Sequence, residues 1–238
     1  LETVDLVDAA GRLKISRTEA LGSIAYPRGA TPPPEVKAGK VDVLAASTWP
    51  APAVPRSSKV VRYRVHTPDA ERFTVPEDLR QKVLKRTAAY LDLEVKAGPV
   101  TKGPLKDRAA HLAETPYEPV KDQRITYAAQ LHTKGKKDKR AKIKALVDYV
   151  YNHVEEKALD RGYAPAPLTL ETRRGDCTEH SVLLSALLRS QGIPTRLVDG
   201  VVITGGRLGY HEWVEVYVDG EGFLAADPTF GEFPASPL

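Results

Sequence analysis

The stretch from residue 177 to residue 227 constrains the fold most, because it reads as one apolar helix followed by strands that alternate in polarity. The helix is apolar on most sides, which is typical of a central, buried helix. Gly192 and Pro194 end it, and an Asp-Gly turn at Asp219 joins the last two strands as a hairpin. The predicted elements are a helix over 177–190 and strands over 196–204, 211–218 and 223–227. A helix packed on an antiparallel sheet is an α+β arrangement.

The sequence before this stretch divides into a strand-rich part and a helical part. Residues 1–75 are punctuated by prolines and contain a predicted hairpin over 4–15 and strand-like segments at 41–44 and 60–65. This part is either a small β domain or a piece of a larger one. Further helices are predicted over 76–91, 105–113, 123–131 and 139–159. We therefore expect a β-rich region over 1–75 and a second domain over 76–238, with its core at 139–230.

The only cysteine of the chain, Cys177, opens the predicted buried helix. Backbone N–H groups and the positive end of the helix dipole favour a thiolate at such a position, and the thiolate is the nucleophilic form. The backbone N–H of Cys177 is also a candidate donor to an oxyanion, and Gly175 permits close approach of the backbone just before it. The structural alternative is an inert thiol, because free cysteines are among the most buried residues.

Hairpin geometry can bring a histidine and an aspartate together near this cysteine. If the loop comprises three residues, 219–221, then Asp227 lies opposite Trp213, on the face of His211 and one diagonal step from it. A four-residue loop would put Asp227 on the other face. Taken alone, His211 is an ordinary polar residue at a strand end, and Asp227 an ordinary turn residue. In combination with Cys177 they have the order and types of a nucleophile, a base and an orienting residue.

Other polar residues are weaker candidates for chemistry. Glu179 and His180 follow the cysteine within one helical turn, and for His180 a structural hydrogen bond is the favoured interpretation. The other histidines have no ligand-like spacing; they are His66, His111, His132 and His153. With a single cysteine, no HExxH motif and no Gly-rich phosphate loop, the sequence predicts neither a metal site nor a cofactor.

Composition excludes several classes of protein. No apolar stretch approaches the roughly 18–20 residues of a membrane span. The net charge of +4 and the pI near 9.0 are weak support for nucleic-acid binding. Basic residues gather over 134–144 without interleaved aromatics, so we interpret this stretch as a solvated surface rather than an anion-binding patch. The chain lacks methionine, which indicates a processed or trimmed product.

Three segments together resemble the core of the transglutaminase-like superfamily. They are the segment from Gly175 to His180 with the following stretch 187–196, the segment from His211 to Tyr217, and the Asp-Pro-Thr at Asp227. They occur in the order and at the spacing of bacterial members, and the similarity covers about 139–230. It implies a papain-like α+β fold, with catalytic residues at Cys177, His211 and Asp227. Such members are often exported, which implies a periplasmic or exported location rather than a cytoplasmic one.

The resemblance leaves the reaction open, because the superfamily contains cross-linking transglutaminases, peptidases, amidases and inactive members. Eukaryotic cross-linking enzymes use a tryptophan upstream of the cysteine as an oxyanion donor, and neither Trp49 nor Trp213 stands at that place. Tyr149 or Tyr151 is the candidate substitute. Further candidates for contact with substrate or oxyanion are Asp176, Glu179, Trp213 and Tyr151. No acidic calcium loop is evident.

The leading hypothesis is a cysteine enzyme that transfers acyl groups from amides of a protein or peptide through a thioester. Water would resolve the thioester in hydrolysis, and an amine such as lysine would do so in transamidation. The alternative is a non-catalytic peptide-binding or scaffold module that keeps the same fold. Neither a nucleic-acid partner nor a membrane span is expected, and the sequence leaves the oligomeric state open.

Overall fold

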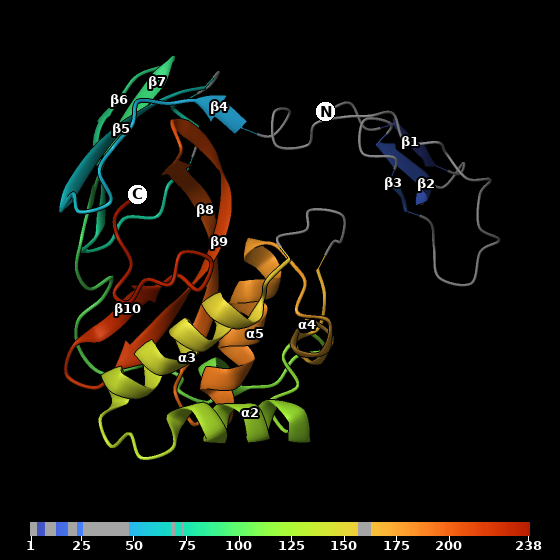
Figure 1. Ribbon diagram of the computed structural model, residues 1–238. Coiled ribbons are helices and arrows are strands. Elements are labelled where there is room, and N and C mark those ends of the chain that lie inside the picture. Colours follow the sequence, from blue (N-terminus) through green and yellow to red (C-terminus); the bar gives the residue numbers. More distant parts are fainter. Residues whose placement is uncertain are drawn as a thin grey trace. The chain divides into compact units, whose positions relative to one another are not determined.

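The computed structural model describes residues 4–7, 13–18, 23–25, 48–67, 70–72, 74–156 and 163–238. The chain forms two compact units, Leu1–Pro50 and Ala51–Leu238. The first contains the antiparallel strands β1 (Val4–Val7), β2 (Leu13–Thr18) and β3 (Ser23–Ala25), together with β4 (Thr48–Pro50) (Figure 1). The β1–β2 pair confirms the predicted hairpin, while the segment 41–44 lies outside the described residues.

The second unit begins with a sheet where the sequence predicted a helix. Strands β5 (Val60–His66), β6 (Gln81–Arg86) and β7 (Tyr90–Lys96) pair antiparallel in the order β5–β7–β6. The prediction of a helix over 76–91 is therefore wrong. A tight turn at Thr87, whose N–H bonds the carbonyl of Tyr90 at 2.9 Å, folds β6 back on β7. The apolar residues of 76–91 have helical spacing, but the pairing of β7 with a strand on each side decides that this segment forms strands.

The helices follow, and each α-helix is started by a polar or proline residue at its N-terminus. Asp122 and Asp138 accept backbone hydrogen bonds at the starts of α2 and α3. Helix α3 ends before the predicted 159, because the chain turns at the buried Val154 to run beside Arg173. The bounds are η2 Ala110–Leu112, α2 Gln123–Thr133, α3 Lys139–His153, α4 Ala166–Thr172 and α5 Cys177–Ser190.

Strands β8 (Thr195–Thr204), β9 (Arg207–Val218) and β10 (Gly222–Ala226) form an antiparallel sheet in which β9 lies between β8 and β10. Helices α3 and α5 pack against one face of this sheet (Figure 1). This confirms the predicted α+β class and the predicted helix, strands and hairpin of the C-terminal stretch.

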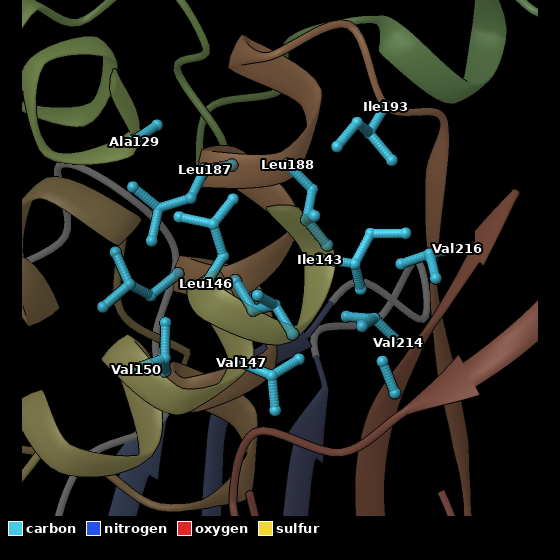
Figure 2. Packing of buried hydrophobic residues seen from close by; sticks show 14 of the residues in the cluster. Ala129, Ile143, Leu146, Val147, Val150, Leu187, Leu188, Ile193, Val214 and Val216 are labelled. Carbon is cyan, nitrogen blue, oxygen red and sulfur yellow. The ribbon is translucent and has the colours of Figure 1, made fainter. Parts of the chain in front are cut away.

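The hydrophobic core lies between α3, α5 and β9. Figure 2 shows the side chains of Ile143 and Val147 on α3 next to Val214 and Val216 on β9. In α5 every residue from Glu179 to Leu188 is buried, which confirms the predicted central helix. Truncating one such leucine to alanine typically costs about 2–5 kcal/mol. The first turn of α5 is therefore held in place by the buried turns behind it.

A short strap, residues 100–103, crosses the β9–β10 hairpin and fixes its position. The N–H of Val100 donates to the carbonyl of Phe223 at 2.7 Å, and the N–H of Phe223 donates to Oγ1 of Thr101 at 3.2 Å. The Tyr217 hydroxyl donates to the carbonyl of Gly103 at 2.9 Å. Because both strands of the hairpin form hydrogen bonds with this one segment, the hairpin is held rigid. The residues at the end of the hairpin away from its loop are held with it.

Candidate active site

Cys177 is the first residue of α5 and is half-buried. Asp176 caps the helix: its Oδ1 accepts the N–H of Thr178 at 2.8 Å, and its own N–H donates to Oε2 of Glu179 at 2.9 Å. This reciprocal capping box fixes the backbone on both sides of the cysteine. The sulfur therefore lies at the positively polarised end of a rigid, buried helix.

Glu179 holds this helix start together and is not available to a substrate. Its side chain is fully buried, and its second oxygen, Oε1, accepts the N–H of Ala164 at 3.1 Å. Gly175 is required for this packing, since a Cβ at that position would lie 2.3 Å from Cβ of Glu179. His180 is also buried, and its Nδ1 contacts the carbonyl of Asp176, as expected of a structural histidine.

The β9–β10 hairpin brings His211 and Asp227 together. Val218 pairs with Gly222 and Val214 with Ala226, which is the register of the three-residue loop expected from the sequence. His211 Nε2 lies 2.7 Å from Oδ2 of Asp227, and both side chains are buried. The other oxygen, Oδ1, accepts backbone N–H groups from the following turn at 2.9 and 3.2 Å. Asp227 is thus fixed, and it fixes the imidazole.

The pKa of His211 depends on the cysteine as well as on Asp227. Burial lowers the pKa of His211, but its hydrogen bonds to Asp227 and Cys177 and the charges of these two groups outweigh burial and raise the pKa to about 9. His211 is therefore largely an imidazolium at neutral pH. A positive charge beside the sulfur stabilises a negative charge on it.

Aromatic rings enclose the imidazole. The ring of Trp213 lies 6.2 Å from that of His211 at 25°, and the ring of Phe230 lies 5.3 Å away at 50°. The Arg56 guanidinium covers Phe230, 4.0 Å from its centroid. These rings limit the access of water to the imidazole. Trp213 therefore packs beside His211, and its Nε1 is buried without a hydrogen-bond partner.

The two tyrosines considered as oxyanion donors lie in different surroundings. Tyr149 stacks on His132 at 3.7 Å between ring centroids, and it also contacts His153. Tyr151 lies beside the turn that follows Asp227, because a Cβ built at Gly231 would be 3.1 Å from its ring. Tyr149 thus packs beside two histidines, and Tyr151 packs against the turn after Asp227.

Three residues that the sequence did not single out lie next to the site. Glu212 is 2% exposed, and its Oε2 accepts the hydroxyl proton of Tyr163. Asp199 is opposite Glu212 in the β8–β9 pairing. Burial, reinforced by the charges of Asp199 and Asp176 and opposed by the Tyr163 hydrogen bond, raises the pKa of Glu212 to about 8. The sequence did contain a signal for Glu212. By strand alternation this acidic residue shares a face of β9 with the apolar Val214, where a charge is unusual.

Within the described ranges, no group of three or more histidine, cysteine, aspartate or glutamate side chains is arranged to hold a metal ion. In those same ranges, none of the helices has the length and apolarity to cross a bilayer.

Comparison with known proteins places residues 125–228 against the family model described as the transglutaminase-like superfamily. No curated protein matches the chain. Among solved structures, a candidate cysteine protease from Cytophaga hutchinsonii is 16% identical, with a TM-score of 0.50 over 77% of this chain and 74% of that one. The periplasmic domain of TgpA from Pseudomonas aeruginosa is 18% identical, with a TM-score of 0.52 over 74% and 72%. At these identities the likeness is one of fold.

Proposed function

We propose that the domain that contains residues 125–228, which match the family model of the transglutaminase-like superfamily, is a cysteine enzyme that transfers acyl groups from amides through a thioester. The observation that supports this most is the buried His211, which is hydrogen bonded to Asp227 at 2.7 Å and whose pKa Cys177 also raises. A peptide-binding module has no need of a charged histidine held between a thiol and a carboxylate. The proposed roles are nucleophile for Cys177, acid and base for His211, and orienting residue for Asp227.

In the proposed reaction, Sγ of Cys177 attacks the amide carbonyl, and the carbonyl electron pair moves onto oxygen. Because Nε2 of His211 faces Asp227, the thiol proton resides on Nδ1. The backbone N–H of Cys177 donates to the oxyanion at the start of the helix. When the tetrahedral intermediate collapses, the C–N bond breaks and His211 delivers its proton to the leaving amine.

The thioester is then resolved by a second nucleophile, which gives its proton to His211 as it attacks. Water yields a carboxylate and completes hydrolysis, whereas a primary amine yields a new amide and completes transamidation. Both outcomes use the same residues and the same first half-reaction. The proposed substrate is a protein or peptide, because the cross-linking enzymes and the peptidases of the superfamily act on amides of that class.

We also propose an exported or periplasmic location. The support is that a periplasmic domain, that of TgpA, shares this fold. Fractionation of cells that express the natural full-length protein checks this, and recovery with cytoplasmic markers alone would contradict it.

Alkylation of the single cysteine tests the function. We expect limiting iodoacetamide to modify Cys177 rapidly at pH 6, although a free cysteine has a pKa of about 8.5. The His211→Ala variant should react at least tenfold more slowly at that pH, because the positive charge beside the sulfur is gone. Asp227→Asn should fall between the two. Intact-mass spectrometry over pH 5–9 gives the rates directly, since only one site can react.

His66→Ala is the matched control, because His66 lies on β5 and is exposed. It should alkylate like the wild type. Slow alkylation that rises only above pH 8, equally in wild type and His211→Ala, would overturn the proposal and favour the binding module. A positive result leads to a substrate test, in which ammonia release and peptide cleavage are followed with glutamine-containing peptides.

A further inference from the structure

A second group of polar side chains borders the proposed triad on two sides. Asp176 directly precedes Cys177, and Glu212 directly follows His211. Asp199 lies across from Glu212 in the β8–β9 pairing, and Tyr163 donates its hydroxyl proton to Glu212. Exposure is graded across the group: Asp199 and Tyr163 are exposed, Asp176 is half-buried, and Glu212 is buried. The group thus runs from the exposed Asp199 and Tyr163 to the buried carboxyl group of Glu212, the residue next to His211.

The buried end of this group has an unsatisfied acceptor. Glu212 is 2% exposed, Tyr163 occupies only its Oε2, and Oε1 is buried without a hydrogen-bond partner. A buried polar atom without a partner typically costs about 1–3 kcal/mol. The group therefore presents several acceptor oxygens, one of them buried and unsatisfied.

We propose that Asp199, Glu212 and Asp176, with the Tyr163 side chain, form a subsite for a primary ammonium group of the substrate, such as a lysine side chain near the amide that reacts. This inference rests on the proposed acyl transfer at Cys177 and names the substrate class that the site selects. An ammonium has three donors. They match the carboxylate of Asp199, the phenol oxygen of Tyr163 and Oε1 of Glu212. An ammonium beside Glu212 would favour the ionised form of that carboxyl group.

An organic ammonium fits better than a metal ion. The described residues contain no cluster of three or more ligands suited to a metal. The group itself combines the cross-strand pair Asp199 and Glu212 with Asp176 and a phenol. The aromatic rings of Tyr163 and Tyr117 meet edge to face, 5.3 Å apart, and both are exposed. They provide an apolar wall for the aliphatic stem that carries a lysine ammonium.

Charged thiol reagents measure this subsite without knowledge of the substrate. Methanethiosulfonates transfer their thiol half to the Cys177 thiolate and release a sulfinate, so the rate reports access and local charge. We expect the 2-aminoethyl reagent, which is cationic, to react about tenfold faster than the neutral methyl reagent, and the anionic 2-sulfonatoethyl reagent to react more slowly than either. In 1 M salt these ratios should contract, because the Debye length falls to about 3 Å.

Asp199→Asn is the decisive variant, since an exposed side chain is changed and folding is not at risk. The cationic-to-neutral ratio should fall at least threefold in it, and further in Asp199→Asn combined with Glu212→Gln. Glu77→Gln is the matched control, because it removes the same charge from an exposed position away from this group. Its ratio should equal that of the wild type.

A peptide pair then tests the substrate class. Glutamine peptides that carry lysine at one flanking position are compared with the same peptides carrying norleucine, which has the same stem length and no charge. We expect kcat/KM to favour lysine at one position by about tenfold, and the preference to disappear in Asp199→Asn.

The two proposals fail in different ways. If the neutral reagent reacts rapidly and depends on His211, but the cationic-to-neutral ratio is the same in wild type and Asp199→Asn, the ammonium subsite is wrong and the acyl-transfer proposal stands. If the neutral reagent reacts no faster than a free thiol and does not depend on His211, the acyl-transfer proposal is wrong as well.

Discussion

At the scale of single residues, His211 retains a positive charge in a place where burial opposes it. Its side chain lies among Trp213 and Phe230, and two acidic partners, Asp227 and Cys177, reverse the effect of desolvation. The charge is therefore a property of the assembled site. In the unfolded chain the same histidine has a pKa of about 6.5.

This difference makes stability depend on pH in one direction. The folded-state pKa of about 9 lies above the unfolded value, so the stabilisation is complete below about pH 6.5 and is lost as the pH rises towards 9. Its full size is at most about 3 kcal/mol. The difference in unfolding free energy between wild type and His211→Gln should be constant below pH 6.5 and shrink above it. Urea titrations at several pH values measure this, and a difference that grows with pH would contradict it.

The contact between His211 and Asp227 could be predicted from the sequence, because loop length and strand alternation alone determine which side chains share a face. The role of Glu179, in contrast, could not be decided from local sequence alone. Its position within one turn of the cysteine is compatible with a substrate contact or with a cap, and the hydrogen bond that it accepts from the N–H of Ala164 decides for the structural role. The Tyr163–Glu212 pair could not be predicted, since it joins a loop to a strand far along the chain.

At the scale of elements, α5 combines a buried body with an accessible first turn. The helix could be predicted because its apolar residues are local in sequence, and β6 and β7 could not, because pairing with a central strand decides their state. What fixes the first turn is the capping box and the close approach of Gly175 to Glu179. Rigidity at this point sets the direction of the Cys177 side chain.

Gly175→Ala should therefore damage both stability and reactivity. The added methyl group would lie 2.3 Å from Cβ of Glu179, at a φ of +157°, so the helix start must shift. We expect a loss of at least about 2 kcal/mol, since overpacking typically costs about 1–3 kcal/mol and a cap is weakened as well. Urea denaturation and the alkylation rate at pH 6 measure the two effects.

Gly98→Ala serves as the control, because Gly98 also has a positive φ, +135°, but nothing lies within 4 Å of the added Cβ. It carries the backbone strain without the clash. Equal losses in both variants would show that the contact with Glu179 is unimportant.

At the scale of the whole molecule, one buried ion pair joins three segments that are distant in sequence. The Arg189 guanidinium on α5 donates to Oε2 of Glu118 at 3.1 Å and to the carbonyl of Thr195, at the start of β8, at 3.0 Å. Ser185 donates to the other oxygen of Glu118. The side chains of the pair are 8% and 4% exposed. The segment before α2, the central helix and the sheet thus share one polar junction.

Glu118→Gln should destabilise the whole second unit, because it leaves the Arg189 charge buried without a counter-ion. Breaking a buried pair in this way typically costs about 3–5 kcal/mol. Glu114→Gln, which removes the partner of Lys121 from an exposed pair, should cost less than about 1 kcal/mol. Chemical denaturation of both variants makes the comparison, and similar losses would contradict the structural importance of the junction.

The solitary thiol at the tip of α5 also has a consequence for oxidative stress. A sulfenic acid formed at Cys177 finds no second thiol within these 238 residues to condense with. Rescue then depends on a small thiol that diffuses in from outside, in competition with irreversible conversion to the sulfinic acid. The amount of glutathione or its equivalent in the surroundings, rather than any feature of the chain itself, would decide how long the protein survives exposure to peroxide.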